Sequence, residues 1–279
     1  MYIKHAAKII SLFALPAIPV LAVAWFFGGT PVMIGVAVLF VLISYTLYRL
    51  SGRILLRWYH ARKIGSVDNL ASRAGVAAPD LYMFESSLPA IFTVGTGGQF
   101  TILVSTSAMG LFDESELGVM LAREIGHIQN GDVPLNTIVA LFAGTIAAFS
   151  TAALWGSLLT GFGQDYDPAP RFIRFLAMGL VAPPAALLVQ LSVARSREHA
   201  ADDAALELTG KPRQLVECLA RLKHHIDLYP AGANPGHAHM FPVNVLRITE
   251  WYDTHLSLFD THPNLESRVD RLLEGSDNG

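Results

Sequence analysis

Hydrophobic positions gather in long uninterrupted runs along this chain, with polar stretches between them. Residues 7–27 are apolar over a length that crosses a bilayer as a helix, with Lys8 at the edge of the run. The turn residues 28–31 (GGTP) lead directly into a second apolar run, residues 31–48. No small-x-small cleavage site ends the first run, so the pattern favours a transmembrane hairpin over a signal peptide.

Two further apolar runs lie in the second half of the chain. Residues 133–160 contain no charged side chain and are long enough to span a membrane. Residues 175–194 form the fourth run, in which Pro183-Pro184 predicts a kink or break. We therefore expect a mainly α-helical integral membrane protein with about four transmembrane helices.

Basic residues follow the second apolar run at once. By the positive-inside rule they place this end of the hairpin in the cytoplasm, and Lys4 and Lys8 lie on the same side. A nucleic-acid patch is the alternative interpretation. It is disfavoured because the charges adjoin a membrane span and the net charge is −3. The run consists of Arg49, Arg53, Arg57, Arg62 and Lys63.

These patterns divide the whole chain into two parts. We expect residues 1–63 to form the hairpin with its basic juxtamembrane segment, and residues 64–279 to form one domain that includes the two later membrane helices. Within that domain a short helix precedes Gly75. Three strand-like segments follow, Leu81–Phe84, Ala90–Val94 and Phe100–Ser105, and predict a small meander. Its edge either binds an extended substrate or serves only as structural support.

A central helix is predicted to begin at Asp113, because Glu116 three residues later completes a capping box. Asn130-Gly131 ends it. This helix carries Arg123-Glu124-Ile125-Gly126-His127, which is the zinc-peptidase pattern H-E-x-x-H with arginine at the first position. In that pattern two imidazoles one turn apart bind zinc and the glutamate is general base for a metal-bound water.

Composition adds to this interpretation. The chain is 52% hydrophobic and only 15% charged, with a mean hydropathy of +0.41, which agrees with membrane spans. Cys218 is the single cysteine, and this excludes an internal disulfide and a multi-thiolate metal site.

A polar helical segment after the fourth run supplies further carboxylates. Glu198 and Asp202 are four residues apart and therefore share a helix face. Glu198 with His127 suggests a zinc site that keeps a position open for water, with Glu124 taking the proton of that water. Asp202 would orient a ligand imidazole.

These motifs together resemble the HtpX family of membrane-bound zinc metallopeptidases, relatives of the CAAX prenyl protease. The resemblance rests on the hairpin, on residues 129–132 (QNGD) after the central helix, on residues 196–202 (SREHAAD), and on His262-Pro263 with Arg268. It implies a zincin-like domain that faces the cytoplasm from the inner (plasma) membrane of a multi-pass protein. The implied activity is endopeptidase cleavage of membrane or misfolded proteins in quality control.

The resemblance also implies roles for single residues. One zinc ion would be held by His127 and Glu198, with Asp202 supporting a ligand. Glu124 and His262 would be catalytic, and Arg268 would contact the oxyanion or the substrate backbone.

Arg123 departs from this family pattern. A guanidinium is always protonated and has no lone pair for a metal, so zinc would be weakened or lost. His199 points about 100° away from Glu198 on the helix, and nothing in the sequence fixes His237 or His239 near the site. The alternative is a pseudopeptidase that binds substrates or partner proteins without cleavage. In it, Arg123 takes the place of the metal beside Glu198 and Asp202.

Overall fold

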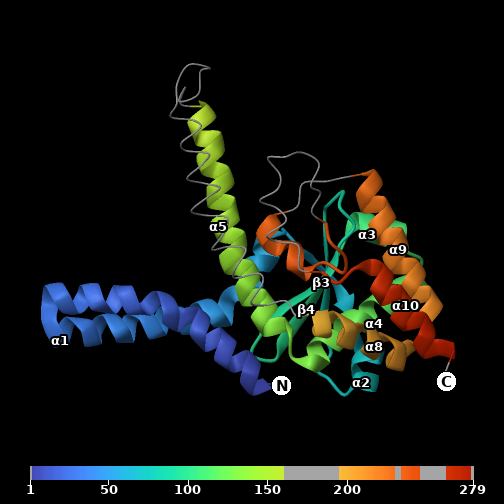
Figure 1. The fold of residues 1–279 in the computed structure, drawn as a ribbon, viewed down its shortest axis with the longest axis horizontal. Coiled ribbons are helices and arrows are strands. Elements are labelled where there is room, and N and C mark those ends of the chain that lie inside the picture. Colours follow the sequence, from blue (N-terminus) through green and yellow to red (C-terminus); the bar gives the residue numbers. More distant parts are fainter. Residues whose placement is uncertain (1, 160–194, 230–233, 246–261, 278–279) are drawn as a thin grey trace.

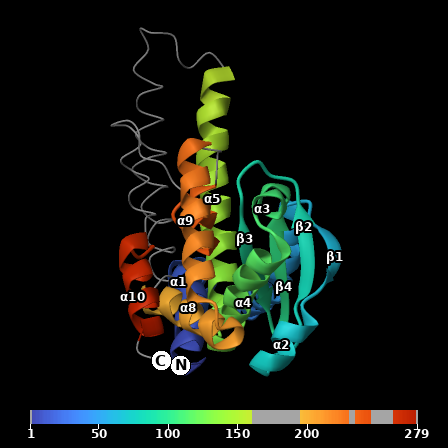
Figure 2. The same ribbon diagram turned by 90° about the vertical axis from the view of Figure 1, so that its right-hand side faces the viewer.

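The computed structural model describes residues 2–159, 195–229, 234–245 and 262–277. A globular body combines a small sheet with a layer of helices, and the long helix α1 (Tyr2–Trp58) extends away from it (Figures 1 and 2).

Helix α1 is a hairpin of two helical arms. Gly29 interrupts it with φ 64° and ψ −167°, a backbone conformation that glycine adopts without strain. The turn predicted at residues 28–31 is therefore confirmed. Among the described residues, Ala7–Trp58 is the one stretch of helix with the length and apolar composition to cross a membrane. Its arms expose large apolar side chains such as Phe26, Phe27 and Val41.

The third apolar run forms α5 (Val133–Leu159). Its first half belongs to the core of the body, where Leu135, Ile138 and Ala140 are buried. Helices α1 and α5 also leave the body in different directions (Figures 1 and 2). The prediction that residues 133–160 span a membrane is not confirmed, since the first half of this run packs as protein interior. The fourth run, residues 175–194, lies outside the described residues.

The sheet has four strands and mixed pairing, so the predicted three-stranded meander is wrong. The strands are β1 (Arg62–Ser66), β2 (Asp80–Phe84), β3 (Ile91–Thr96) and β4 (Gln99–Ser105), in the order β1-β2-β4-β3. Strand β2 pairs with β4 in parallel, because the chain between β2 and β3 crosses to the far side of β4. Strand β1 falls in the basic segment and is mostly exposed, so no hydrophobic alternation marks it.

Helix α4 (Glu114–Asn130) has the boundaries that the sequence predicts. Asp113 accepts from the backbone N–H of Glu116, and Glu116 accepts from that of Asp113, which completes the capping box. Gly131 ends the helix in the left-handed conformation, with φ 75°. Residues 119–128 are buried throughout, because α4 lies between the sheet and other helices.

Helices from the C-terminal half cover the other side of α4 (Figure 2). Helices α8 and α9 both pack against α4, and α10 packs against α9 and α8. Two short helices on the sheet side, α2 and α3, complete the body. The bounds are α2 (Asp68–Ala74), α3 (Thr106–Leu111), α8 (Arg195–Thr209), α9 (Pro212–Leu228), the 3₁₀ helix η2 (Pro235–Met240) and α10 (Leu265–Asp277).

Candidate functional site

The guanidinium of Arg123 lies at the centre of a buried ion cluster between α4 and α8. Its side chain is only 1% exposed. Nη1 donates to Glu124 at 3.0 Å, Nε donates to Asp202 at 3.1 Å, and Nη2 donates to Glu198. The two contacts with α8 are those expected from the sequence. Three carboxylates therefore surround one permanently charged group.

Asp202 is held by a second arginine from α10. Arg268 donates to its two oxygens from Nε at 2.8 Å and from Nη2 at 2.7 Å. The remaining nitrogen, Nη1, donates to the carbonyl of Pro242 at 2.7 Å. Arg268 is thus brought into the cluster as predicted, but its donors are engaged by the protein itself.

Glu124 has both of its oxygens engaged. Oε1 accepts from Arg123, and Oε2 accepts from the hydroxyl of Thr93 on β3 at 2.8 Å. Burial raises the pKa of Glu124, while His127 and Arg123 lower it less strongly. A carboxylate that is bonded on both oxygens is poorly placed to take a proton from a water molecule.

His127 lies one helical turn after Arg123. Its Nε2 is 3.9 Å from Oε1 of Glu198, and its Nδ1 is 3.4 Å from Oδ2 of Asp132. Burial lowers the pKa of His127, but the hydrogen bond to Asp132 and the nearby carboxylates outweigh it, so that the pKa is raised. Arg197 lies 3.6 Å from the other oxygen of Asp132. This second group extends the cluster along α8.

The charges of the cluster control one another's ionisation. Burial raises the pKa of Glu198, but the attraction of Arg123 and then of His127 outweighs burial and lowers the pKa to about 2. Burial lowers the pKa of Arg123, whereas Glu198, Asp202 and Glu124 together raise it above its ordinary value. Both groups are therefore ionised at neutral pH.

The hydrogen bonds of the other candidate histidines go to groups outside the set of carboxylates around Arg123. His262, which the sequence predicts to be catalytic, is half-buried. Its Nε2 donates to the carbonyl of Phe241 at 2.8 Å, and burial lowers its pKa. His239 donates to the carbonyl of Asn136 at 3.1 Å. His237 bonds through Nδ1 to the hydroxyl of Tyr59 at 2.7 Å.

For three members of the cluster, no role in the site is predicted from the sequence. Thr93 lies on a strand with no motif, and Arg197 carries no metal-binding signature. Asp132 and Arg197 lie in the segments 129–132 and 196–202 that carry the family resemblance, and this is the signal that points to them.

The residues around Arg123 do not fit a zinc ion. Zinc needs three or four lone-pair donors around one point, and the arginine nitrogens have none to offer. Among the described residues, no group of three or more His, Cys, Asp and Glu side chains is arranged to hold a metal. The guanidinium instead occupies the hydrogen-bonding positions of Glu124, Glu198 and Asp202.

Known proteins resemble the chain over most of its length. The profile of peptidase family M48 matches residues 61–275. The protease HtpX homologue of Desulforapulum autotrophicum is 32% identical over 263 residues, which cover 90% of this chain and 84% of that protein. The protease HtpX homologue of Thermococcus kodakarensis is 30% identical over 263 residues, with coverages of 90% and 89%.

A solved structure is also similar. The crystal structure of S. mikatae Ste24p matches with a TM-score of 0.44 and 15% sequence identity. The match covers 96% of this chain and 64% of that one, so this chain spans less than two thirds of the length of that relative.

Proposed function

The chain belongs to peptidase family M48, and from this premise we propose that it is an HtpX-like membrane protein that binds protein segments without hydrolysing them. In this proposal Arg123 supplies the positive charge that a zinc ion supplies in an active peptidase. Its carboxylate partners keep their positions, and the fold is retained without the reaction.

The observation that carries the proposal is the buried set of hydrogen bonds around Arg123. Three carboxylates without a cation would be strongly destabilising in an interior of low dielectric. The guanidinium compensates their charge with geometry that suits carboxylates. Peptide hydrolysis also needs a base and a polarising group. Here Glu124 is bonded on both oxygens, and Arg123 is bonded to Glu124, Glu198 and Asp202.

The membrane part of the proposal rests on α1. Its apolar arms are followed by Arg49, Arg53 and Arg57, which favours a cytoplasmic position for the body by the positive-inside rule. We propose a multi-pass protein of the inner (plasma) membrane on this basis. Its ligands are then segments of membrane or misfolded proteins, in agreement with the quality-control role that the HtpX resemblance implies.

The sheet offers one edge for an extended segment. Strand β3 forms one edge, and it is buried along its whole length. Strand β1 forms the other edge and is largely exposed. We propose that a bound segment adds to β1, where main-chain groups are open to pairing.

The test is metal analysis of the full chain, purified in mild detergent, together with cleavage of fluorescent casein with and without a chelator. We expect far less than one zinc per chain and no chelator-sensitive cleavage, because one ligand position is a guanidinium. The variant Arg123→His restores an imidazole and is expected to raise the zinc content.

A second candidate, zinc endopeptidase activity, is favoured by the retention of Glu124, His127 and Glu198 in one cluster. Stoichiometric zinc in the unaltered chain, with cleavage that a chelator abolishes, would establish it and reject the proposal. Capture of unfolded polypeptide without cleavage supports the proposal, and failure to retain any polypeptide counts against it.

A further inference from the structure

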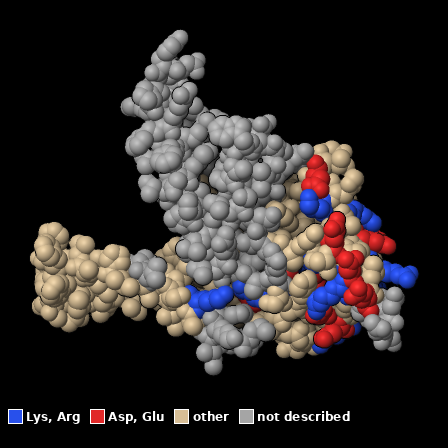
Figure 3. Space-filling model, in the orientation of Figure 1, with Lys and Arg blue, Asp and Glu red and all other residues tan. Residues whose placement is uncertain are grey.

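Two arginines at the end of the apolar part of α1 line a polar cavity. Arg49 and Arg53 are four residues apart, so they share one face of the helix. The cavity has a volume of about 470 Å³ and lies between α1, β2 and the turn that joins β3 to β4. In Figure 3 blue Lys and Arg atoms lie where α1 meets the body, and the part of α1 farther from the body shows none on this face. The cavity therefore lies at the boundary between apolar and charged surface.

The turn beside the cavity is tied to α1. The hydroxyl of Thr96 donates to the carbonyl of Tyr48 at 2.7 Å. Gly97 and Gly98 have φ angles of 63° and 82°, and a Cβ added at Gly97 would lie 2.6 Å from Nη1 of Arg49. Arg49 thus extends over a turn whose glycines leave room for it.

The cavity has a positive net charge. Among the described residues that line it, Asp80 is the one acidic residue, and that carboxylate pairs with Lys63 at 2.6 Å. Neither Arg49 nor Arg53 forms an ion pair with a described residue. Two exposed guanidiniums with free donors therefore face a space that suits a phosphate group.

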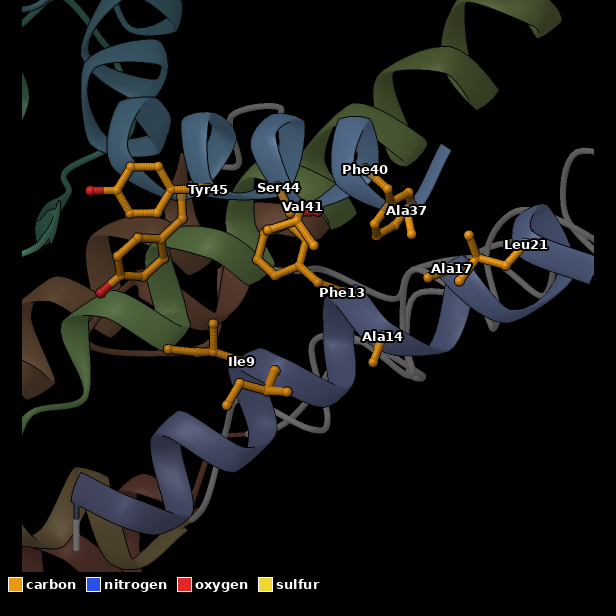
Figure 4. Close-up of a pocket in the computed structure, with 12 residues that line it drawn as sticks. Ile9, Phe13, Ala14, Ala17, Leu21, Ala37, Phe40, Val41, Ser44 and Tyr45 are labelled. Atoms are coloured by element: carbon orange, nitrogen blue, oxygen red, sulfur yellow. The ribbon is translucent and has the colours of Figure 1, made fainter. Parts of the chain in front are cut away.

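An apolar groove of about 610 Å³ lies between the two arms of α1 (Figure 4). Phe13, Ala17 and Leu21 of the first arm face Phe40 and Val41 of the second across it. The ring of Phe13 also contacts that of Phe142 on α5, with centroids 5.5 Å apart, so the first arm leans toward α5. Tyr45, at the end of the groove near the body, carries one of its few polar groups.

A third cavity lies between the groove and the basic cavity and shares wall residues with both. It has a volume of about 520 Å³. It shares Ile9 and Tyr48 with the apolar groove, and Gly98 and Phe100 with the basic cavity. The three cavities are therefore neighbours, and together they extend from the two arginines to the space between the helical arms.

We propose that these neighbouring cavities bind one anionic phospholipid, with its phosphate at Arg49 and Arg53 and an acyl chain in the groove between the arms of α1. The cavities follow one another in space as a cationic end, an intermediate cavity and an apolar groove. This order matches a lipid headgroup followed by its acyl chain. The inference rests on the proposed membrane position of α1 and is independent of the cluster around Arg123.

The test measures lipid bound to the full chain by native mass spectrometry after equilibration in mixed micelles of phosphatidylglycerol and phosphatidylcholine. The variant Arg49→Gln/Arg53→Gln removes the two cavity charges. The matched control Arg57→Gln/Arg62→Gln removes two basic charges that line none of the three cavities. We expect preferential retention of phosphatidylglycerol by the unaltered chain and the control. In the cavity variant the preference should fall roughly thirty-fold, since each surface cation contributes about 1 kcal/mol.

Two further experiments distinguish the contribution of the lipid's acyl chain from that of its headgroup. Ala17→Phe fills the groove and is expected to lower retention of phosphatidylglycerol while both arginines remain. Millimolar inorganic phosphate should leave the lipid in place. Equal losses in the cavity variant and in the control would show diffuse charge attraction and overturn the proposal, as would displacement of the lipid by phosphate. Insertion into phosphatidylcholine vesicles that resists alkaline extraction reports on the membrane position separately.

Discussion

Gly126 of α4 faces Ala204 of α8 at a distance that leaves no room for another carbon atom. A Cβ added at Gly126 would lie 2.7 Å from Cβ of Ala204 and 3.1 Å from the carbonyl oxygen of Ala201. This close approach lies one turn from Arg123 and allows its side chain to reach two carboxylates of α8. The glycine of the R-E-x-G-H segment is therefore a packing requirement of the cluster.

Gly126→Ala is expected to lower the melting temperature, although alanine favours the helix by about 1 kcal/mol. The added methyl group meets backbone and a short side chain that cannot turn aside, and overpacking typically costs about 1–3 kcal/mol. Gly118→Ala in the same helix is the control, because nothing lies within 4 Å of its added carbon. Thermal unfolding followed by circular dichroism should give opposite signs for the two variants. A rise for both would contradict the close packing.

Arg123→Met is expected to reduce the free energy of unfolding by about 3–5 kcal/mol, because it leaves buried carboxylates without their cation. Arg123→Lys should lose less, since one ammonium keeps the charge but cannot match the bonds of a planar guanidinium. Arg221→Met serves as control. It breaks an ion pair with Glu116 in which the arginine is 44% exposed, and should cost no more than about 1 kcal/mol. Denaturant titration in mild detergent measures all three, and equal effects at the two sites would argue against a cluster centred on Arg123.

Arg268→Gln is expected to loosen α10, because Asp202 and the carbonyl of Pro242 lose their donor together. The loss should again be about 3–5 kcal/mol, as for a broken buried ion pair. Arg271→Gln, three residues later, breaks only the exposed pair with Asp203 and should have little effect. Hydrogen exchange of the amides of α10 is the readout, with faster exchange in the first variant alone.

Acid is expected to remove the stability that Glu198 contributes. Its pKa in the folded protein is about 2, below the ordinary 4.5, so the unfolded chain binds the proton first as the pH falls. The contribution is complete above pH 4.5 and disappears as the pH approaches 2. The difference in free energy of unfolding between the unaltered chain and Glu198→Gln should shrink over that window. A difference that stays constant from pH 6 to about 3 would contradict the depressed pKa.

The local chemistry of the chain could be predicted well. Gly29 marks the hairpin turn, Asp113 and Glu116 mark the start of α4, and the spacing of Glu198 and Asp202 places both on one helix face. The pairing of Arg123 with these two residues follows from charge alone, because buried carboxylates need a cation. Local rules were sufficient for these features.

Long-range arrangements could not be predicted in the same way. The order of the strands depends on where the chain crosses after β2, and no local pattern encodes this. Strand β1 has no apolar alternation, and Thr93 enters the cluster only because β3 lies against α4. The sequence of the first half of α5 predicts a membrane span, although this part is buried in the body. A buried core helix and a lipid-exposed helix share the same apolar composition, so the sequence does not distinguish them.

The hydrogen bonds of Asp202 join residues that are synthesised at different times. Arg123 precedes it by 79 residues, and Arg268 follows it by 66. A nascent chain can bring α4 and α8 together as soon as α8 has left the ribosome, but the full coordination of Asp202 waits for α10. Asp202 therefore cannot gain its full set of hydrogen bonds before residue 268 has been synthesised.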